Sequence, residues 1–167
     1  RMSADLLVEL ARIGTVGITG TRGKSTVTHL ITHTLKRSGK KVLLGGNVRG
    51  VSNLSLLPEI TPDTILVLEL DSWQLQGFGE AKISPNIAVF TNLKQDHFNY
   101  YPDEESYFAD KANIFKFQKE GDILIAGQAV TQRWLAHAHP PILPTVPKKI
   151  PDEWKRKIIG EHNTENA

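Results

Sequence analysis

The chain has 167 residues, its 20 Lys and Arg nearly balance its 18 Asp and Glu for a formal charge of +2, and it has no cysteine. This balance argues against nucleic-acid and membrane partners, and the missing cysteine excludes disulfides, iron–sulfur clusters, cysteine-ligated zinc and cysteine nucleophiles. The length suits one domain with a sizeable core, and neither a membrane-spanning apolar run nor a signal peptide is recognisable, so we expect a cytoplasmic chain.

Short apolar runs alternate with helical patterns along the chain. Strands are predicted at 15–19, 41–44, 64–70, 86–91 and 122–126, and helices at 25–38, 103–117 and 131–139. Two of the strands, 64–70 and 86–91, are nearly continuous apolar runs, as in strands that are covered on both faces. This alternation predicts an α/β fold with a mostly parallel sheet flanked by helices, and with ligands beyond the carboxyl ends of the strands.

The C-terminal part of the chain has two segments of unusual composition. Segment 140–147 is rich in proline and predicts a loop or an extended segment at a sheet edge. Segment 148–157 is basic, and we favour a solvated connector over a nucleic-acid patch because Trp154 is its only aromatic residue.

A glycine-rich segment at 17–26 reads Gly-Ile-Thr-Gly-Thr-Arg-Gly-Lys-Ser-Thr and lies between a predicted strand and a predicted helix. Gly20 and Gly23 allow a close backbone approach to an anion, and the free N–H groups and dipole of the helix start favour negative charge. Lys24 can reach the β- and γ-phosphates of a nucleotide, and Ser25 offers a hydroxyl to Mg²⁺. The segment therefore predicts a P-loop-type nucleotide-binding domain.

The spacing departs from the common form of this loop, whose first glycine would fall at Ile18 rather than at Gly17. A glycine-rich turn with a chance Lys-Ser pair is the alternative. We favour phosphate binding because the loop, the lysine, the hydroxyl and the flanking elements all agree. The candidate nucleotide-binding residues of the loop are Gly20, Thr21, Arg22, Gly23, Lys24, Ser25 and Thr26.

Two further candidates lie at or after the ends of other predicted strands. Glu69 lies near the end of the 64–70 strand, where a carboxylate is costly to bury unless it is paired or bound to a metal. A solvent-facing acid explains this position equally well. His97 follows the 86–91 strand as part of an Asp-His pair, which by itself is more often a hydrogen-bonded structural histidine.

Three more positions have both a functional and a structural explanation. Lys111 falls on the apolar stripe of the 103–117 helix, and its spacing alone favours a lysine whose stem covers apolar surface while its amine reaches solvent. The Gly-Gly-Asn turn at 45–47 fits a loop that needs positive φ. Asn163 fits a helix N-cap.

Several of these segments together resemble the Mur ligase family, whose members are ATP-dependent amide-forming enzymes that activate a carboxylate as an acyl phosphate. Gly-Thr-Arg-Gly-Lys-Ser at 20–25 resembles the ATP loop of this family, with Arg22 at its variable position. Glu-Leu-Asp-Ser-Trp-Gln-Leu at 69–75 resembles the Glu-Leu-Ser-Ser-Phe-Gln-Leu signature of the branch that adds D-glutamate. The resemblance implies ATP and Mg²⁺ as cofactors.

The same resemblance implies metal ligands. Ser25 and Glu69 would bind Mg²⁺, and Asp71 replaces a family serine near the metal, so it could either ligate Mg²⁺ or repel phosphate. Asn-Leu-Lys-Gln-Asp-His at 92–97 resembles the motif whose histidine, here His97, binds a second Mg²⁺. Asn99 stands in place of the final aspartate of that motif.

Three other segments resemble family motifs. Asp-Lys-Ala-Asn-Ile-Phe at 110–115 resembles the segment whose lysine is carbamylated, which would make Lys111 a carboxylate-like metal ligand or support. The turn at 45–47 resembles one whose asparagine, Asn47, approaches the substrate, and Gly-Glu-His-Asn at 160–163 resembles a motif whose asparagine, Asn163, contacts adenine. The catalytic residues that the resemblance implies are Lys24, His97 and Lys111.

The resemblance covers roughly residues 13–167 and implies addition of D-glutamate to UDP-N-acetylmuramoyl-L-alanine in peptidoglycan synthesis. Residues 1–167 would be most of the central ATPase domain, with its C-terminal end cut and with the flanking UDP-binding and C-terminal domains absent. We therefore expect that the chain by itself has no ligase activity. We also expect a monomer. The alternatives are another amide ligase, such as a folylpolyglutamate synthase, and a P-loop NTPase or nucleotide-binding module, which would have no use for the 69–75 segment.

Overall fold

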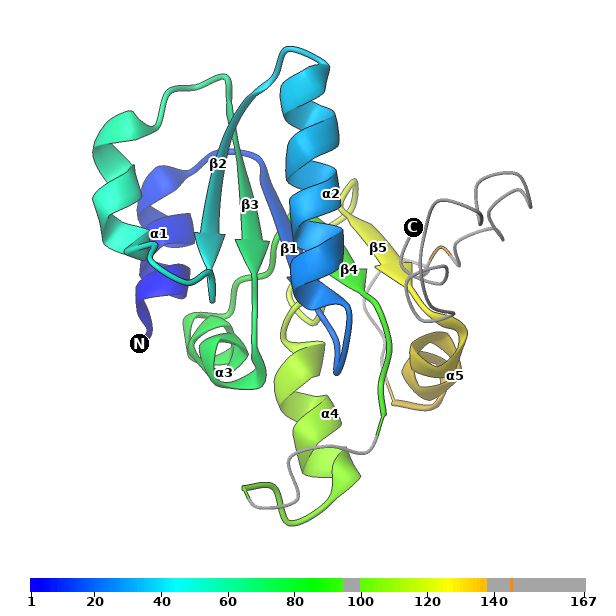
Figure 1. Ribbon diagram of the computed structural model, residues 1–167. Helices are drawn as coiled ribbons and strands as arrows, with labels where there is room; N and C mark the ends of the chain where they lie inside the picture. The colour runs from blue at the N-terminus through cyan, green and yellow to red at the C-terminus, as the bar shows by residue number, and fades with distance from the viewer. Residues whose placement is uncertain (95–99, 138–144, 146–167) are drawn as a thin grey trace, which may run out of the picture.

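The computed structural model describes residues 1–94, 100–137 and 145, and within them the strands form one sheet in which every pairing is parallel (Figure 1). The strands are β1 Thr15–Thr19, β2 Lys41–Gly46, β3 Thr64–Glu69, β4 Ile87–Phe90 and β5 Ile123–Ala126. Their order across the sheet is β2-β3-β1-β4-β5. The chain thus winds from β1 to one side of the sheet and then, after β3, returns to the other side of β1.

Helices cover both faces of this sheet. They are α1 Ser3–Ala11, α2 Lys24–Arg37, α3 Ser72–Ala81, α4 Glu104–Ala112 and α5 Gln128–His137, together with a 3₁₀ helix, η1 Asn53–Glu59. None of the helices in the described part of the chain is long and apolar enough to cross a membrane. The fold is therefore the helix-flanked parallel sheet that the sequence predicts.

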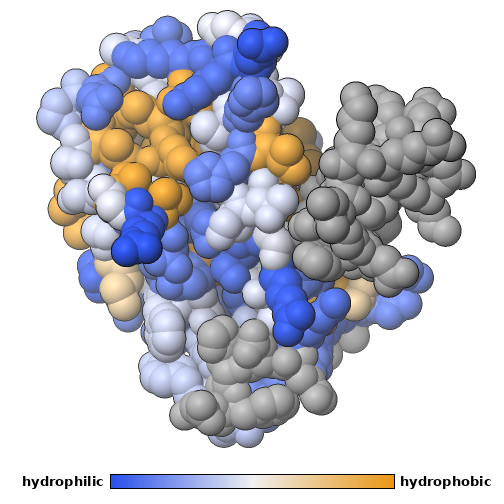
Figure 2. Space-filling model, viewed as in Figure 1, coloured by the Kyte–Doolittle hydropathy of each residue, from blue (hydrophilic) through white to orange (hydrophobic). Residues whose placement is uncertain are grey.

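The sheet separates two apolar cores because side chains alternate between its faces. The larger core joins strand residues such as Leu66 and Phe90 to Leu7 of α1, Phe78 of α3 and Phe108 of α4. The smaller core lies between the strands and α2, and it includes no residue from another described helix. Apolar surface is consequently visible beside α2, over β2 and β3 (Figure 2).

The predicted strands match the observed strands to within two residues at each end. The β2 strand is longer than predicted, because Gly45 and Gly46 continue the ladder opposite Leu68 and Glu69 of β3. The 103–117 prediction is too long, since α4 ends at Ala112 and turns follow it. The predicted 131–139 helix begins earlier, at Gln128. Thr145 of the proline-rich segment forms a parallel bridge with Ile125, which supports an extended segment at the sheet edge.

The sequence prediction missed α1, η1 and α3. In α3 the apolar pattern is interrupted by Gly77 and Gly79, which are poor helix formers. Both glycines serve packing, because a Cβ on Gly77 would lie 2.6 Å from Asp5 Oδ1 of α1, and one on Gly79 would lie 2.6 Å from Asn113 Nδ2. Close contact with neighbouring elements therefore explains a helix that its local sequence does not favour.

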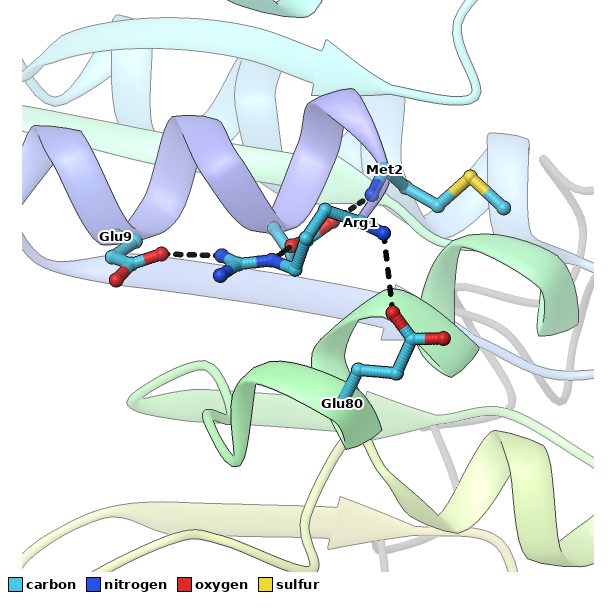
Figure 3. A network of polar contacts seen from close by, with 5 residues as sticks. Arg1, Met2, Glu9 and Glu80 are labelled. Carbon is cyan, nitrogen blue, oxygen red and sulfur yellow. Dashed lines mark hydrogen bonds and ion pairs between the residues drawn. The ribbon is translucent and has the colours of Figure 1, made fainter.

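Polar contacts at the start of α1 close its first turn and also connect it to α3 (Figure 3). The Met2 N–H donates to Asp5 Oδ1 over 2.6 Å, and the Arg1 amino group lies 3.1 Å from Glu80 Oε2 at the end of α3. The Arg1 guanidinium also contacts Asp5 and Glu9. These contacts hold α1 and α3 together on the same face of the sheet.

Candidate functional site

The carboxyl ends of β1, β3 and β4 meet at the point where the direction of strand winding reverses. In open α/β sheets this is where ligands bind. The glycine-rich loop follows β1, Glu69 ends β3, and the segment from Thr91 to Lys94 follows β4. The predicted phosphate loop and Glu69 are therefore brought to one edge of the sheet by topology.

Two glycines give the loop a backbone conformation that other residues rarely adopt. Gly20 has φ +144°, and a Cβ there would lie 2.0 Å from Thr91 Oγ1. Gly23 has φ +82° and is the N-cap residue of α2. Because glycine has no side chain, no side-chain hydrogen bond caps the helix there. The first backbone bond of α2 runs from the Val27 N–H to Gly23 O, so the N–H groups of Lys24, Ser25 and Thr26 have no acceptor within the helix. Free N–H groups at the start of a helix are suited to bind an anion.

The loop is held by the segment after β4. The Thr21 N–H donates to Asn92 O over 2.9 Å, and the Arg22 N–H donates to Asn92 Oδ1 over 3.0 Å. The Arg22 carbonyl in turn accepts from Asn92 Nδ2 over 3.0 Å and from Thr91 Oγ1 over 2.7 Å. The sequence prediction gave no role to Thr91 or Asn92. Their position at the end of the strand predicted at 86–91 was the signal that could have identified them.

Lys24 and Lys111 converge on the same carbonyl group of the loop. Lys24 Nζ donates to Gly20 O over 3.1 Å and to Thr21 O over 3.1 Å. Lys111 Nζ donates to Gly20 O over 3.2 Å and to Thr19 Oγ1 over 3.3 Å. Two lysine amines at one position concentrate positive charge where a phosphate would bind.

The expectation that the Lys111 amine reaches solvent is wrong. Lys111 is only 2% exposed, and its Nζ lies 4.8 Å from the centroid of the Tyr107 ring. The reason is that α4 packs beside the carboxyl end of β1, so the inward-facing side chain meets the glycine loop instead of the surface. The functional alternative, in which Lys111 belongs to the site, fits this position.

A partly buried hydrogen-bond network holds α4 in place. Asp110 Oδ2 accepts from the Tyr101 hydroxyl over 2.8 Å and from Gln76 Nε2 of α3 over 2.7 Å. Burial raises the pKa of Tyr101 above its ordinary value, and the bond to Asp110 raises it further. The phenol therefore remains a donor at neutral pH, and the network positions the residue next to Lys111.

Glu69 and Ser25 form the second part of the site. Ser25 Oγ donates to Glu69 Oε1 over 3.0 Å, and Glu69 is 6% exposed. A solvent-facing acid at this position is therefore wrong. A carboxylate and a hydroxyl are the hard oxygen donors that Mg²⁺ prefers, so these two side chains fit the predicted metal.

Asp71 has a structural role that the sequence prediction did not include. Its Oδ1 accepts from the Gln74 N–H over 2.8 Å, and Gln74 Oε1 lies 3.4 Å from the Asp71 N–H, which makes a capping box at the start of α3. The cap engages one carboxylate oxygen. A contact between Asp71 and Mg²⁺ stays a prediction.

Asn47 follows β2 and is exposed beside Glu69. Its N–H donates to Glu69 O over 2.6 Å. The preceding Gly46 has φ +85°, and a Cβ there would lie 2.0 Å from the Glu69 carbonyl oxygen. The turn therefore needs glycine, as its structural explanation requires, and it also brings Asn47 to the candidate site.

His97 and Asn163 lie outside the described residues, as do Asn99 and the basic segment 148–157. Within the described residues no group of three or more His, Cys, Asp and Glu side chains could hold a metal ion. The roles that the sequence analysis gives to His97 and Asn163 stay predictions.

A separate open groove of about 870 Å³ lies at the opposite edge of the sheet. It is lined by the end of α1 and by segments that precede β1, β3 and β4, including Arg12, Gly14, Pro62 and Asn86. Ligands of parallel sheets bind at the carboxyl ends of the strands, and this groove lies at their amino ends. The glycine loop with Ser25 and Glu69 is therefore the better candidate.

The chain is similar in sequence to ligases of known activity. The chain is 40% identical over 114 residues to the UDP-N-acetylmuramoylalanine–D-glutamate ligase of Borreliella afzelii, which covers 68% of the chain and 25% of that protein. The ligase of the same name from Clostridium kluyveri is 43% identical over 109 residues, covering 65% of the chain and 23% of that protein. The chain thus spans about a quarter of the length of these relatives.

A solved structure shows the same fold. The MurF ligase of Thermotoga maritima in complex with ADP superposes with a TM-score of 0.60 and 23% identity, covering 87% of the chain and 36% of that protein. The family model described as the Mur ligase middle domain matches residues 18–146, which include the glycine loop, Glu69 and Lys111. The chain therefore belongs to the Mur ligase family, of which it carries the middle domain.

Proposed function

We propose that this chain is the nucleotide-binding part of an ATP-dependent ligase that adds D-glutamate to UDP-N-acetylmuramoyl-L-alanine through an acyl phosphate. The observation that carries the proposal is the convergence of Lys24, Lys111, Ser25 and Glu69 at the carboxyl edge of the sheet. Phosphoryl transfer depends mainly on positioning and on neutralisation of charge, which this group of side chains can supply.

The glycine loop binds the phosphates of ATP in this proposal. The N–H groups at the start of α2 point toward the phosphates, and Lys24 exchanges its two loop carbonyls for phosphate oxygens. Ser25 and Glu69 hold Mg²⁺, which neutralises charge on the phosphates. Loop residues Thr21 and Arg22 stay in place because Asn92 holds their backbone.

Lys111 is carbamylated in the working enzyme according to this proposal. A neutral lysine amine adds to CO₂ and releases a proton, and the resulting carbamate is an anion. Because Lys24 and Lys111 share the Gly20 carbonyl, carbamylation would place an anion beside the Lys24 ammonium group. The anionic oxygens of the carbamate would join Glu69 as metal ligands or would support the metal.

The D-glutamate assignment rests on the curated relatives and on the 69–75 segment. Asn47 contacts the UDP-linked substrate, His97 binds a second Mg²⁺ and Asn163 contacts adenine. The remaining substrate contacts come from domains outside this chain, so the chain alone binds nucleotide weakly and forms no amide bond. We propose that the enzyme acts in the cytoplasm, where ATP and UDP-linked precursors are present. We further propose that it is a monomer.

The test uses the full-length enzyme that carries this segment and measures phosphate release from ATP. UDP-N-acetylmuramoyl-L-alanine and D-glutamate together should stimulate release, and the product should contain a new amide bond. L-glutamate in place of D-glutamate is the matched control. Stimulation by folate substrates instead would identify the folylpolyglutamate synthase alternative, and release that no amino acid stimulates would identify a nucleotide-hydrolysing module.

A further inference from the structure

A buried side chain outside all the family-like motifs connects the site to α1. Asn53, the first residue of η1, is 5% exposed. Its Oδ1 accepts from the Gly46 N–H over 2.7 Å, and its Nδ2 donates to Ser3 Oγ over 3.0 Å. The orientation of the amide follows from chemistry, since only the oxygen can accept from a backbone N–H.

The bond to Gly46 acts at a tightly packed position. Gly46 pairs with Glu69 in the sheet, and its φ of +85° places it against the Glu69 carbonyl. The next N–H, that of Asn47, donates to the same carbonyl over 2.6 Å. The backbone of Glu69 is therefore contacted by a turn whose first N–H is held by the Asn53 side chain.

Glu69 connects this turn to the phosphate loop. Its carboxylate accepts from Ser25 Oγ over 3.0 Å, so a shift of the Glu69 backbone would move one of the two oxygen groups that fit Mg²⁺. Groups that orient metal ligands through hydrogen bonds commonly affect metal affinity although they do not touch the metal. Asn53 occupies such a position through the backbone of the 46–47 turn.

We infer that Asn53 is a positioning residue, which holds the 46–47 turn against β3 and thereby sets the position of Glu69 for metal binding and of Asn47 for substrate. The part of this inference that concerns the metal and the substrate rests on the proposed function. The part that concerns the turn is independent of it, so the two can be tested separately.

The test compares three changes in the 167-residue chain. Asn53→Ala removes both hydrogen bonds, and Asn53→Asp keeps an acceptor oxygen for Gly46. Ser3→Ala removes only the hydrogen bond between Asn53 Nδ2 and Ser3 Oγ and leaves the bond to Gly46 in place. Gln118→Ala is the matched control for loss of a buried polar side chain, because Gln118 is 4% exposed and donates to backbone carbonyls at the opposite edge of the sheet.

Amide hydrogen exchange of Gly46 and Asn47 is the first measurement, and it needs no ligand. Asn53→Ala should accelerate the exchange of both amides on the order of tenfold relative to global unfolding measured on the same samples. Asn53→Asp, Ser3→Ala and Gln118→Ala should leave it close to wild type. Unchanged exchange of the Asn47 amide in Asn53→Ala would overturn the inference.

The second measurement is the dissociation constant of Mg²⁺ for the full-length enzyme that carries this segment, saturated with ADP. Asn53→Ala should raise it on the order of tenfold, whereas Ser3→Ala and Gln118→Ala should not. A purely structural role would lower the stability of Asn53→Ala and Gln118→Ala alike without changing Mg²⁺ affinity, and that result would overturn the link to the metal. A wild-type full-length enzyme that binds no Mg²⁺-ADP would contradict the proposed function, while the exchange experiment would still decide the role of Asn53 in the turn.

Discussion

Lys24 of α2 and Lys111 of α4 donate to one carbonyl oxygen, that of Gly20, over 3.1 and 3.2 Å. The two lysines come from helices that contact different faces of the sheet, and only the glycine loop brings their amines together. A carbonyl dipole compensates the Lys24 cation less well than a phosphate does, so this arrangement favours exchange of the carbonyl for an incoming nucleotide phosphate.

Removal of the Lys24 amine should greatly weaken nucleotide binding. We expect Lys24→Ala to lower the affinity for ADP at least on the order of tenfold, because a charge-assisted bond to phosphate is lost. Lys36→Ala, at the exposed C-terminal end of the same helix, should bind as wild type does. Calorimetric titration with ADP measures both, and equal affinities of the two variants would contradict the phosphate-loop assignment.

The Glu69 carboxylate should determine the Mg²⁺ requirement. Glu69→Gln keeps the shape and an acceptor for Ser25 but removes the charge, so we expect the Mg²⁺ concentration for half-maximal nucleotide binding to rise on the order of tenfold. Asp63→Asn removes an exposed carboxylate before β3 and serves as the control. A metal titration of Glu69→Gln that overlays the wild-type curve would return Glu69 to a structural role.

Carbamylation of Lys111 predicts a specific spectroscopic signal. After incubation with ¹³C-labelled bicarbonate, the wild-type chain should show a carbamate carbon resonance that Lys111→Met lacks. Methionine preserves the length of the apolar stem against Tyr107, so the variant should fold. A resonance that persists in Lys111→Met would assign the modification to another amine, and no resonance in the wild-type enzyme with Mg²⁺ and nucleotide would argue against a carbamate.

Gly20 should tolerate no side chain. Gly20→Ala would place a Cβ 2.0 Å from Thr91 Oγ1 at a φ of +144°, so we expect a loss of about 2 kcal/mol or more in the free energy of unfolding. Gly14→Ala is the matched control, because a Cβ there meets nothing within 4 Å and its φ is not positive. Urea unfolding compares the two, and similar stabilities would refute the tight packing of the loop against Thr91.

The N-cap of α4 should make stability depend on pH. The Asp103 carboxylate accepts from the Ser106 N–H over 2.7 Å, and this bond lowers the pKa of Asp103 below its ordinary value of 3.8. A lowered pKa stabilises the folded state at pH values above 3.8, and this stabilisation is lost as the pH falls through the folded-state pKa. Asn is also a good N-cap but does not titrate, so Asp103→Asn should lose less stability between neutral and acid pH in urea unfolding.

Parts of the fold were predictable because their signals are local. The strands β1, β3 and β4 are apolar runs of the right length, and α2 has an apolar stripe between the glycine loop and Gly39, which has φ +80° just after the helix. By contrast, α3 was missed because Gly77 and Gly79 weaken its pattern, and their presence is explained only by Asp5 and Asn113 of neighbouring elements.

The sequence by itself determined the helix-flanked parallel sheet, the glycine loop and the resemblance to the Mur ligases, since each depends on residue types at short, fixed spacings. Only the tertiary structure decided which side chains meet: Ser25 with Glu69, Lys24 with Lys111, and Asn53 with Gly46. The first two pairs are distant in sequence, and strand order and register bring them together, whereas Asn53 lies seven residues after Gly46 and reaches it because the chain turns back after β2. Burial then decided between alternatives that spacing left open, because a carboxylate or amine enclosed at the end of a central strand needs a partner.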